Sequence, residues 1–223
     1  MTNLISPITI AISGASGTVY GLRILQFLLE NNYNVDFVIS GSASKVAKEE
    51  IGLELSLNPH LLKEQVLSYF TVKTNPAFLN VWAHNDISAS ISSGSYRSLG
   101  MIIVPASMGT VAAIACGTSD NLITRAADVC LKERRKLVLV PREMPFSSIH
   151  LENLLKLSKT GAIIAPACPG FYHNPEKLTD AIDFVAGKVL DLFGIDHNLF
   201  KRWKEDVVLR HCEERSDKAI PKT

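Results

Sequence analysis

The sequence predicts an α/β protein, a three-layer α/β/α sandwich around a mostly parallel sheet. Two observations lead to this prediction. Short runs of apolar, mostly β-branched residues alternate with longer amphipathic stretches along the 223 residues. The apolar runs are also continuous, as in strands that are buried on both faces. Strands of this kind, separated by helices, are typical of a doubly wound, Rossmann-like sheet.

The individual elements follow from local features. The first strand, ITIAIS at residues 8–13, ends in a glycine-rich turn that opens a helix. Two later strands, residues 101–105 and 137–141, each end in a proline, which cannot donate a ladder hydrogen bond. The other strands are predicted at residues 35–40 and 162–166, with a short one near 79–83. The helices are predicted at residues 19–29, 43–51, 60–70, 109–115, 121–132, 148–159 and 175–193.

Composition and charge limit the class of protein. Hydrophobic residues make up 47% of the chain and charged residues 20%, which fits a globular domain. We expect one domain over residues 1–203 and a disordered tail over 204–223. The formal net charge of +1 argues against nucleic acid as a partner. No apolar run reaches the roughly 18 residues of a membrane span, and no basic leader precedes the first apolar run, so we expect a cytoplasmic protein.

The four cysteines are widely spaced and form no CxxC pair. This spacing indicates a reducing compartment and no metal site. Cys116 and Cys130 lie in apolar stretches and are expected to be buried. Cys168 has no activating neighbour in the sequence, so it is not a candidate nucleophile.

Ligands of an open parallel sheet bind at the carboxyl ends of its strands, and five predicted strand ends carry informative residues. After the first strand, Gly14, Ala15, Ser16 and Gly17 form a turn that a phosphate can approach, with a helix N-terminus behind it. The turn is neither GxGxxG nor a P-loop, which favours a mononucleotide over a dinucleotide or a nucleoside triphosphate. A plain strand-to-helix turn explains this segment alone equally well.

The next two strand ends add hydroxyl groups. Ser40 can hydrogen-bond a ribose-like hydroxyl, whereas Glu50, in the helix that follows, is by itself better explained as a solvated residue. The turn after residue 105 holds Ser107, Met108, Gly109 and Thr110. Ser107 is a good helix N-cap. Because this is a second turn of glycine and hydroxyl residues at the expected place, the interpretation as a wall of a ligand site is slightly favoured.

Charged residues mark the fourth strand end. On the preceding helix Arg125, Asp128 and Lys132 share one face, which a solvated, salt-bridged surface also explains. We expect that explanation to hold for Arg134, Arg135 and Lys136. The strand then ends in Pro-Arg-Glu-Met-Pro, where two prolines bracket Arg142 and Glu143. Arginine can bind a phosphate through two hydrogen bonds, and glutamate can transfer a proton.

The fifth strand end, the loop at residues 166–173, mixes small residues with the phenol of Tyr172, as in a loop that closes on a flat ligand. Lys188 and Trp203, further along, are individually weak candidates. The chain has no Ser-His-Asp order, no HExxH motif and no paired carboxylates suited to Mg²⁺. Glycine-and-hydroxyl turns together with an Arg/Lys cluster therefore predict two anionic ligands, one of them a cofactor.

Several segments together form a family pattern: GASGTVYGLRIL, VISGSA, PASMGTVAAIACG and PGFYHNP, with the long stretch from Asp120 to Ser158 the most specific. With these segments the chain resembles the UbiX-type flavin prenyltransferases, from about Ile8 to Trp203. The resemblance implies a flavodoxin-like fold. It implies a metal-free reaction that joins a dimethylallyl group from dimethylallyl phosphate to N5 and C6 of reduced FMN. It also implies a homododecamer whose product, prenylated FMN, serves a UbiD-type decarboxylase.

The resemblance further implies roles for single residues. FMN is expected to contact Gly14, Ala15, Ser16, Ser40, Ser107, Met108, Gly109, Thr110 and Arg125. Dimethylallyl phosphate is expected to contact Lys132, Arg142, Glu143, Tyr172, Lys188 and Trp203, some of them from a neighbouring subunit. Glu143 would protonate the departing phosphate, and Lys132 would stabilise its charge. Ser16 and Glu50 would relay protons around flavin N5.

Two other functions are weighed against this one. An FMN-dependent decarboxylase of the phosphopantothenoylcysteine decarboxylase-like class would share the fold and the FMN site. Such enzymes need a histidine base early in the chain, and residues 20–34 contain no histidine. An FMN carrier without catalytic activity is the other alternative, but it would need no second phosphate site with an acid.

Overall fold

The structure is a computed structural model that describes residues 6–70 and 74–203. It divides into two compact units, residues 1–168 and residues 169–223. The first unit contains the whole β-sheet, and the second contains helix α7 (Leu178–Asp191). A single domain over residues 1–203 stays a prediction. The expected tail at 204–223 lies outside the described residues.

Six parallel strands form the sheet of the first unit: β1 (Ile8–Ile12), β2 (Val35–Ile39), β3 (Leu79–Val81), β4 (Gly100–Ala106), β5 (Lys136–Pro141) and β6 (Ile163–Ile164). Their order is β3-β2-β1-β4-β5-β6, and every neighbouring pair is parallel. Without the short edge strand β3, this is the strand order of flavodoxin. The predicted α/β fold class is confirmed. The winding reverses between β1 and β4, so a ligand crevice is expected at their carboxyl ends.

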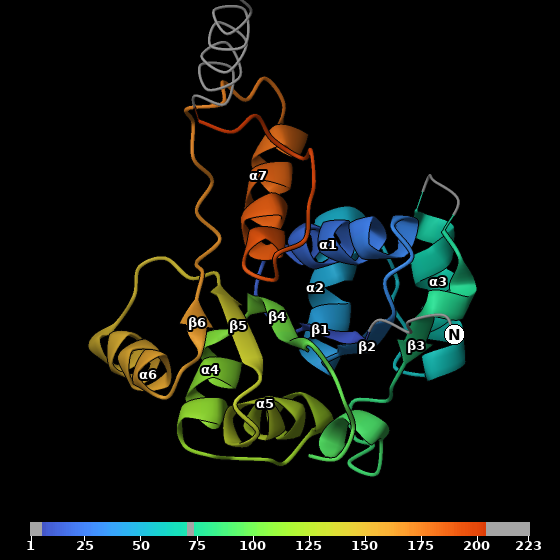
Figure 1. Ribbon diagram of the computed structural model, residues 1–223, viewed down its shortest axis with the longest axis vertical. Coiled ribbons are helices and arrows are strands. Elements are labelled where there is room, and N and C mark those ends of the chain that lie inside the picture. The colour runs from blue at the N-terminus through green and yellow to red at the C-terminus, as the bar shows by residue number, and fades with distance from the viewer. Residues whose placement is uncertain (1–5, 71–73, 204–223) are drawn as a thin grey trace, which may run out of the picture. The chain divides into compact units, whose positions relative to one another are not determined.

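Helices cover both faces of this sheet: α1 (Thr18–Glu30), α2 (Gly41–Ile51), α3 (Pro59–Tyr69), α4 (Met108–Ala115), α5 (Leu122–Lys132) and α6 (Ser148–Lys159). Figure 1 shows α1 on one face and α4 and α5 on the other. The predicted bounds agree with the observed ones to within three residues. No helix among the described residues is long and apolar enough to cross a membrane.

The core explains why the strands are mostly apolar. Ala11, Ile103 and Leu139 are fully buried in one cluster with apolar residues of α4 and α5. On the opposite face Ile12 meets α1 at Gly21, where an added Cβ would stand 2.8 Å from Ile12 Cδ1. Each strand therefore buries side chains in both directions, and glycine lets α1 come this close to the sheet.

Two local predictions were wrong. Pro105 does not end its strand, because β4 continues to Ala106 across a shift in register. Cys116 is exposed, since it is the C-cap of α4 and lies beyond the buried part of the helix. Cys130 is buried as predicted, and burial raises the pKa of its thiol to about 11.

Candidate active site

Two adjoining cavities lie at the carboxyl ends of β1 and β4, where the winding of the sheet reverses. Their volumes are about 450 Å³ and 260 Å³, and both are lined by Gly14 and Ser107. The lining of the larger cavity includes Ala15, Ser16, Glu50, Arg142 and Glu143. The lining of the smaller one includes Ser40, Ser42, His84, Thr110 and Asn121. The first four predicted strand ends thus meet in one crevice.

The two turns that frame the crevice are tied together by Ser13. Its hydroxyl donates to the Pro105 carbonyl at 2.9 Å and accepts from the Ser107 backbone N–H at 2.7 Å. Ser13 is buried, so these bonds hold the turn after β1 against the turn after β4. Nothing in the sequence singled this serine out, because it looks like the last residue of a strand.

Glycine is required at the start of the first turn. A Cβ on Gly14 would overlap with the Cβ of Ser42, at the beginning of α2. The β1 turn therefore packs directly on the α2 N-terminus, and this close approach brings Ser40 and Ser42 to the cavity edge.

The N-terminus of α1 is bonded to the carboxylate of Glu50. Gly17 N–H donates to both carboxylate oxygens at 2.9 and 3.0 Å, and Thr18 N–H donates to Glu50 Oε2 at 3.2 Å. Gly17 has φ +103°, a conformation that glycine adopts without strain. Glu50 is therefore the cap of α1, and these N–H groups, which the sequence suggested for a phosphate, already have an anionic partner.

The N-terminus of α4 is open by comparison. Ser107 caps it by accepting from Thr110 N–H at 3.3 Å, while its hydroxyl also lies 3.0 Å from the Thr110 hydroxyl. A Cβ on Gly109 would meet no atom within 4 Å. The first N–H groups of an α-helix have no partner within the helix, and they carry its positive dipole end. This end of the crevice suits a phosphate group.

His84 adds a polar group that the sequence had not indicated. It lines the smaller cavity, and its Nδ1 is buried without a partner among the described residues. Burial lowers the pKa of His84, with Asp120 acting in the opposite direction. The imidazole is therefore neutral near pH 7, and a ligand in this cavity would supply the missing hydrogen bond.

Arg142 and Glu143 follow β5 and face the larger cavity. Arg142 Nε donates to the Ser16 carbonyl at 3.2 Å, which joins the end of β5 to the glycine turn. The Glu143 carboxylate is exposed and accepts from Met144 N–H at 3.1 Å. The pKa of Tyr20 is raised by burial and by Cys168, and lowered in part by Arg142. The lining of this cavity thus combines the cations Lys45 and Arg142 with three exposed glutamates, Glu49, Glu50 and Glu143.

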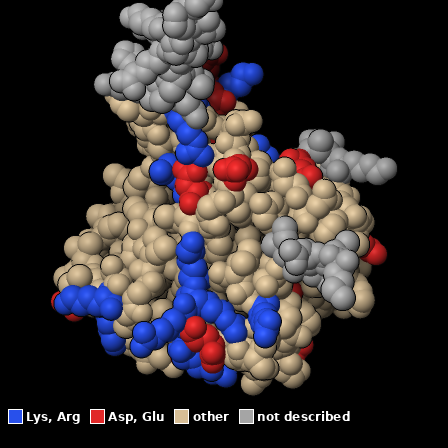
Figure 2. Space-filling model, in the orientation of Figure 1, with Lys and Arg blue, Asp and Glu red and all other residues tan. Residues whose placement is uncertain are grey.

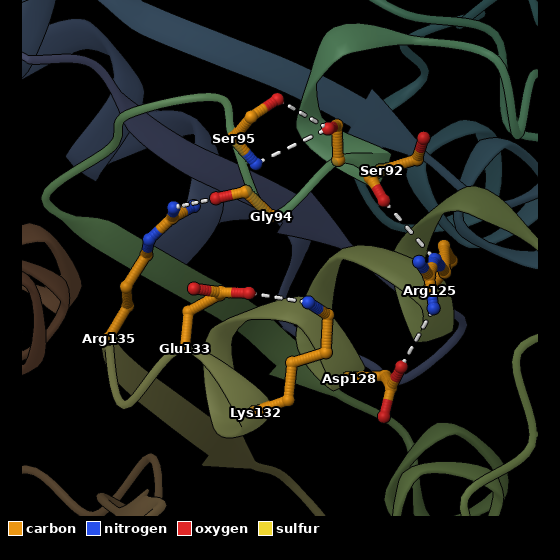
Figure 3. A network of polar contacts seen from close by, with 9 residues as sticks. Ser92, Gly94, Ser95, Arg125, Asp128, Lys132, Glu133 and Arg135 are labelled. Carbon is orange, nitrogen blue, oxygen red and sulfur yellow. Dashed lines mark hydrogen bonds and ion pairs between the residues drawn. The ribbon is translucent and has the colours of Figure 1, made fainter.

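Two predicted site residues on α5 do not line these cavities. Arg125 donates through Nε to the Ser92 carbonyl at 3.2 Å and through Nη1 to Asp128 at 2.9 Å. Lys132 forms an ion pair with Glu133. Figure 3 shows both side chains beside the loop that holds Ser92 and Gly94. Within one chain, therefore, the predicted Arg/Lys/Arg cluster is divided between α5 and the crevice.

Basic residues also gather beyond α5. Figure 2 shows Lys and Arg side chains around an acidic group over the segment that joins α5 to β5. A separate cavity of about 660 Å³ is lined there by Arg134, Arg135 and Lys136. Arg135 donates to the Gly94 carbonyl, so at least one of these residues does more than face solvent as predicted.

The remaining predicted residues lie in the second unit. Tyr172 and Trp203 are in edge-to-face contact, with ring centroids 5.4 Å apart. The Lys188 ammonium lies 3.6 Å from Asp191, one turn along α7. Trp203 is the last described residue and is largely exposed.

The fold and the crevice define a flavodoxin-like protein with a mononucleotide site. A family model described as Flavoprotein matches residues 2–191. The flavin prenyltransferase UbiX of Alkalihalophilus pseudofirmus is 49% identical over 197 residues, 88% of this chain and 96% of that one. The UbiX of Pseudomonas aeruginosa is 47% identical over 198 residues, 89% and 94% of the two chains. The chain belongs to the flavin prenyltransferase (UbiX) family of flavoproteins, as its motifs predicted.

Similar solved structures support the same family assignment. AnUbiX in complex with FMN and dimethylallyl pyrophosphate is 40% identical with a TM-score of 0.79, covering 89% of this chain and 97% of that one. A dodecameric FMN-dependent UbiX-like decarboxylase from Escherichia coli O157:H7 is also 40% identical, with a TM-score of 0.77 and coverage of 88% and 98%. The FMN-dependent cysteine decarboxylase TvaF, at 16% identity, a TM-score of 0.53 and coverage of 72% and 89%, shares the fold alone. The decarboxylase alternative is therefore the more distant one.

Proposed function

We propose that this protein joins a dimethylallyl group from dimethylallyl phosphate to N5 and C6 of reduced FMN. The observation that carries the proposal is that the two ends of one crevice have different chemical groups. An open helix N-terminus with hydroxyl groups lies at one end. Arg142 lies at the other end, where the lining also includes Glu50 and Glu143 among three glutamates. A carrier of FMN needs only the first of these ends.

The two helix N-termini support one orientation of FMN. Glu50 is bonded to the N–H groups of α1, so a phosphate there would meet a carboxylate. The FMN phosphate is therefore placed at the N-terminus of α4, with Ser40, Ser107 and Thr110 around it. His84 supports this placement, because its buried Nδ1 lacks a partner among the described residues and can hydrogen-bond a phosphate in this cavity. The flavin ring then extends toward Ser16, in the larger cavity.

The residues at the cavity that Arg142 and Glu143 line suit transfer of an allylic group. The bond between the allylic carbon and the phosphate oxygen breaks while a bond to the flavin forms, so negative charge grows on the departing phosphate. Arg142 and Lys132 stabilise that charge, and Glu143 donates a proton to the phosphate. Reduced FMN, when bound, would supply N5 as the acceptor of the group in this step. The bond at C6 would then form by addition across the remaining carbon–carbon double bond, with one proton gained by the five-carbon unit and one lost from C6. Glu50 and Ser16 receive and pass on the proton that the flavin loses.

Completion of the site by a second copy of the chain explains the position of α5. Arg125 and Lys132 do not line the crevice of their own chain, and we assign them to the site of a neighbouring subunit in a homododecamer. A dodecamer is the assembly named for the E. coli relative. Tyr172, Lys188 and Trp203 are assigned to the dimethylallyl phosphate as well, and a UbiD-type decarboxylase to the product.

The test is anaerobic incubation of the purified protein with reduced FMN and dimethylallyl phosphate, followed by mass spectrometry of the released flavin. The expected result is a flavin heavier by one five-carbon unit. A parallel reaction with dimethylallyl pyrophosphate identifies the donor. Recovery of unmodified FMN from both reactions would refute the proposal and favour the decarboxylase or the carrier.

A further inference from the structure

The loop at residues 82–99, here called the serine-rich loop, holds α5 along its length. The His84 carbonyl accepts from Leu122 N–H, at the start of the helix, at 2.8 Å. The Ser92 carbonyl accepts from Arg125 Nε at 3.2 Å. The Gly94 carbonyl accepts from Arg135, just beyond the helix end. Figure 3 shows Arg125 and Arg135 reaching this loop from α5 and from the segment after it.

A buried carboxylate anchors the loop to the sheet. Asp36 of β2 is fully buried and accepts from Tyr96 Oη at 2.8 Å and from Trp82 Nε1 at 2.9 Å. Asn80 of β3 adds a longer contact of 3.4 Å. Tyr96 and Trp82 lie near the two ends of the serine-rich loop. One side chain therefore fixes both ends. Loss of the Tyr96 hydroxyl leaves Asp36 Oδ2 without its described donor, whereas Oδ1 is shared by Trp82 and Asn80.

Gly94 is the point where the loop meets the functional end of α5. A Cβ on Gly94 would stand 2.7 Å from the Lys132 ammonium and would overlap with a carboxylate oxygen of Glu133. Both atoms are the far ends of flexible side chains. The backbone of Gly94 has no positive φ, so alanine is tolerated by the chain and would displace the ammonium instead.

We propose that the serine-rich loop positions the Lys132 ammonium for the phosphate of the prenyl donor, through Gly94 and its anchor Asp36–Tyr96. Gly94, Tyr96 and Asp36 are positioning residues, since none of them lines the crevice. The inference rests on the proposed function, because it takes Lys132 as a ligand of that phosphate. Its consequence is that small changes in the loop alter substrate binding while the chemical step is preserved.

The test is steady-state prenyl transfer by Gly94→Ala in the full-length protein. KM for dimethylallyl phosphate should rise about tenfold, which corresponds to ~1.4 kcal/mol, while kcat and the dissociation constant for FMN stay within about twofold. In a Lys132→Ala background the same substitution should leave KM unchanged, because the ammonium that it displaces is absent. An equal rise in KM in both backgrounds, or a fall in kcat without a rise in KM, would overturn the inference.

Tyr96→Phe is the second variant and retains the ring while removing one donor to Asp36. It should raise KM in the same direction, again only when Lys132 is present. Tyr69→Phe, which removes an exposed hydroxyl on α3, is the matched control and should leave KM unchanged. If Gly94→Ala lowers the melting temperature too far for kinetic measurements, KM of Tyr96→Phe with and without Lys132 tests the positioning role instead. Absence of product with the unmodified protein contradicts the proposed function, whereas normal turnover with unaffected variants contradicts only the positioning role.

Discussion

Glu50 has two separable roles, and two substitutions distinguish them. Its carboxylate caps α1 through three contacts of 2.9 to 3.2 Å from two N–H groups. Loss of an N-cap costs about 0.5–2 kcal/mol, and because Glu50 is exposed we expect about 1 kcal/mol for Glu50→Ala. For a chain of this length that corresponds to a fall of about 2–4 °C in the melting temperature. Glu50→Gln keeps one acceptor oxygen and loses the charge, so its melting temperature should fall by about half as much.

The same two substitutions distinguish the role of Glu50 in proton transfer from its role as a helix cap. If Glu50 moves protons at the flavin, Glu50→Gln should slow prenyl transfer by about 100-fold or more despite its small effect on stability. Calorimetry and single-turnover transfer are measured on both variants, with Glu64→Gln, an exposed carboxylate of α3, as control. A melting temperature of Glu50→Ala equal to that of the unmodified protein would refute the cap. A normal rate for Glu50→Gln would refute the relay.

Four further outcomes are expected. Glu143→Gln should keep FMN affinity while the rate of transfer falls about 100-fold or more; unchanged turnover would remove it from the mechanism. Lys132→Ala should raise KM for dimethylallyl phosphate, and normal saturation would contradict its role. Burial raises the pKa of Asp36, so between pH 3.8 and that raised pKa the folded protein keeps a proton that the unfolded chain has lost. Its contribution to stability therefore falls as the pH rises through this range, and urea unfolding of Asp36→Asn should lack that decrease. Deletion of the residues after Glu205 should preserve activity and assembly, and a smaller particle in light scattering would show otherwise.

The fold could be predicted because each strand can be recognised from its own local sequence pattern. The run at β1 is buried at every position and apolar except at Thr9, since it lies in the centre of the sheet with helices on both sides. The rule that ligands bind at strand ends then placed Gly14, Ser107 and Arg142 in one crevice without any knowledge of their contacts. Such predictions depend only on periodicity and on the direction of parallel strands.

The connections across the crevice could not be predicted in this way. Ser13 and Pro105 are 92 residues apart, and Glu50 is 33 residues from Gly17. Both contacts depend on how far each loop extends beyond its strand, which hydrophobic periodicity does not encode. His84 was missed for the same reason, because it belongs to a loop without regular structure. For Glu50 the local sequence suggested only a solvated residue, whereas the fold makes it a helix cap.

Arg125 and Lys132 form ion pairs within their own chain and would still be able to bind a phosphate. Lys132 and Glu133 are both substantially exposed, with 45% and 37% of their side-chain surfaces accessible. An exposed pair of this kind is worth about 0–1 kcal/mol, whereas hydrogen bonds to charged groups contribute about 1.5–3 kcal/mol. A phosphate can therefore take the ammonium from Glu133 at little cost. Arg125 and Asp128 are similarly accessible, so the same holds for both cations. The carboxylates hold the two side chains in place on the isolated chain and would compete only weakly with a phosphate. This agrees with the proposal that a second copy of the chain completes the site.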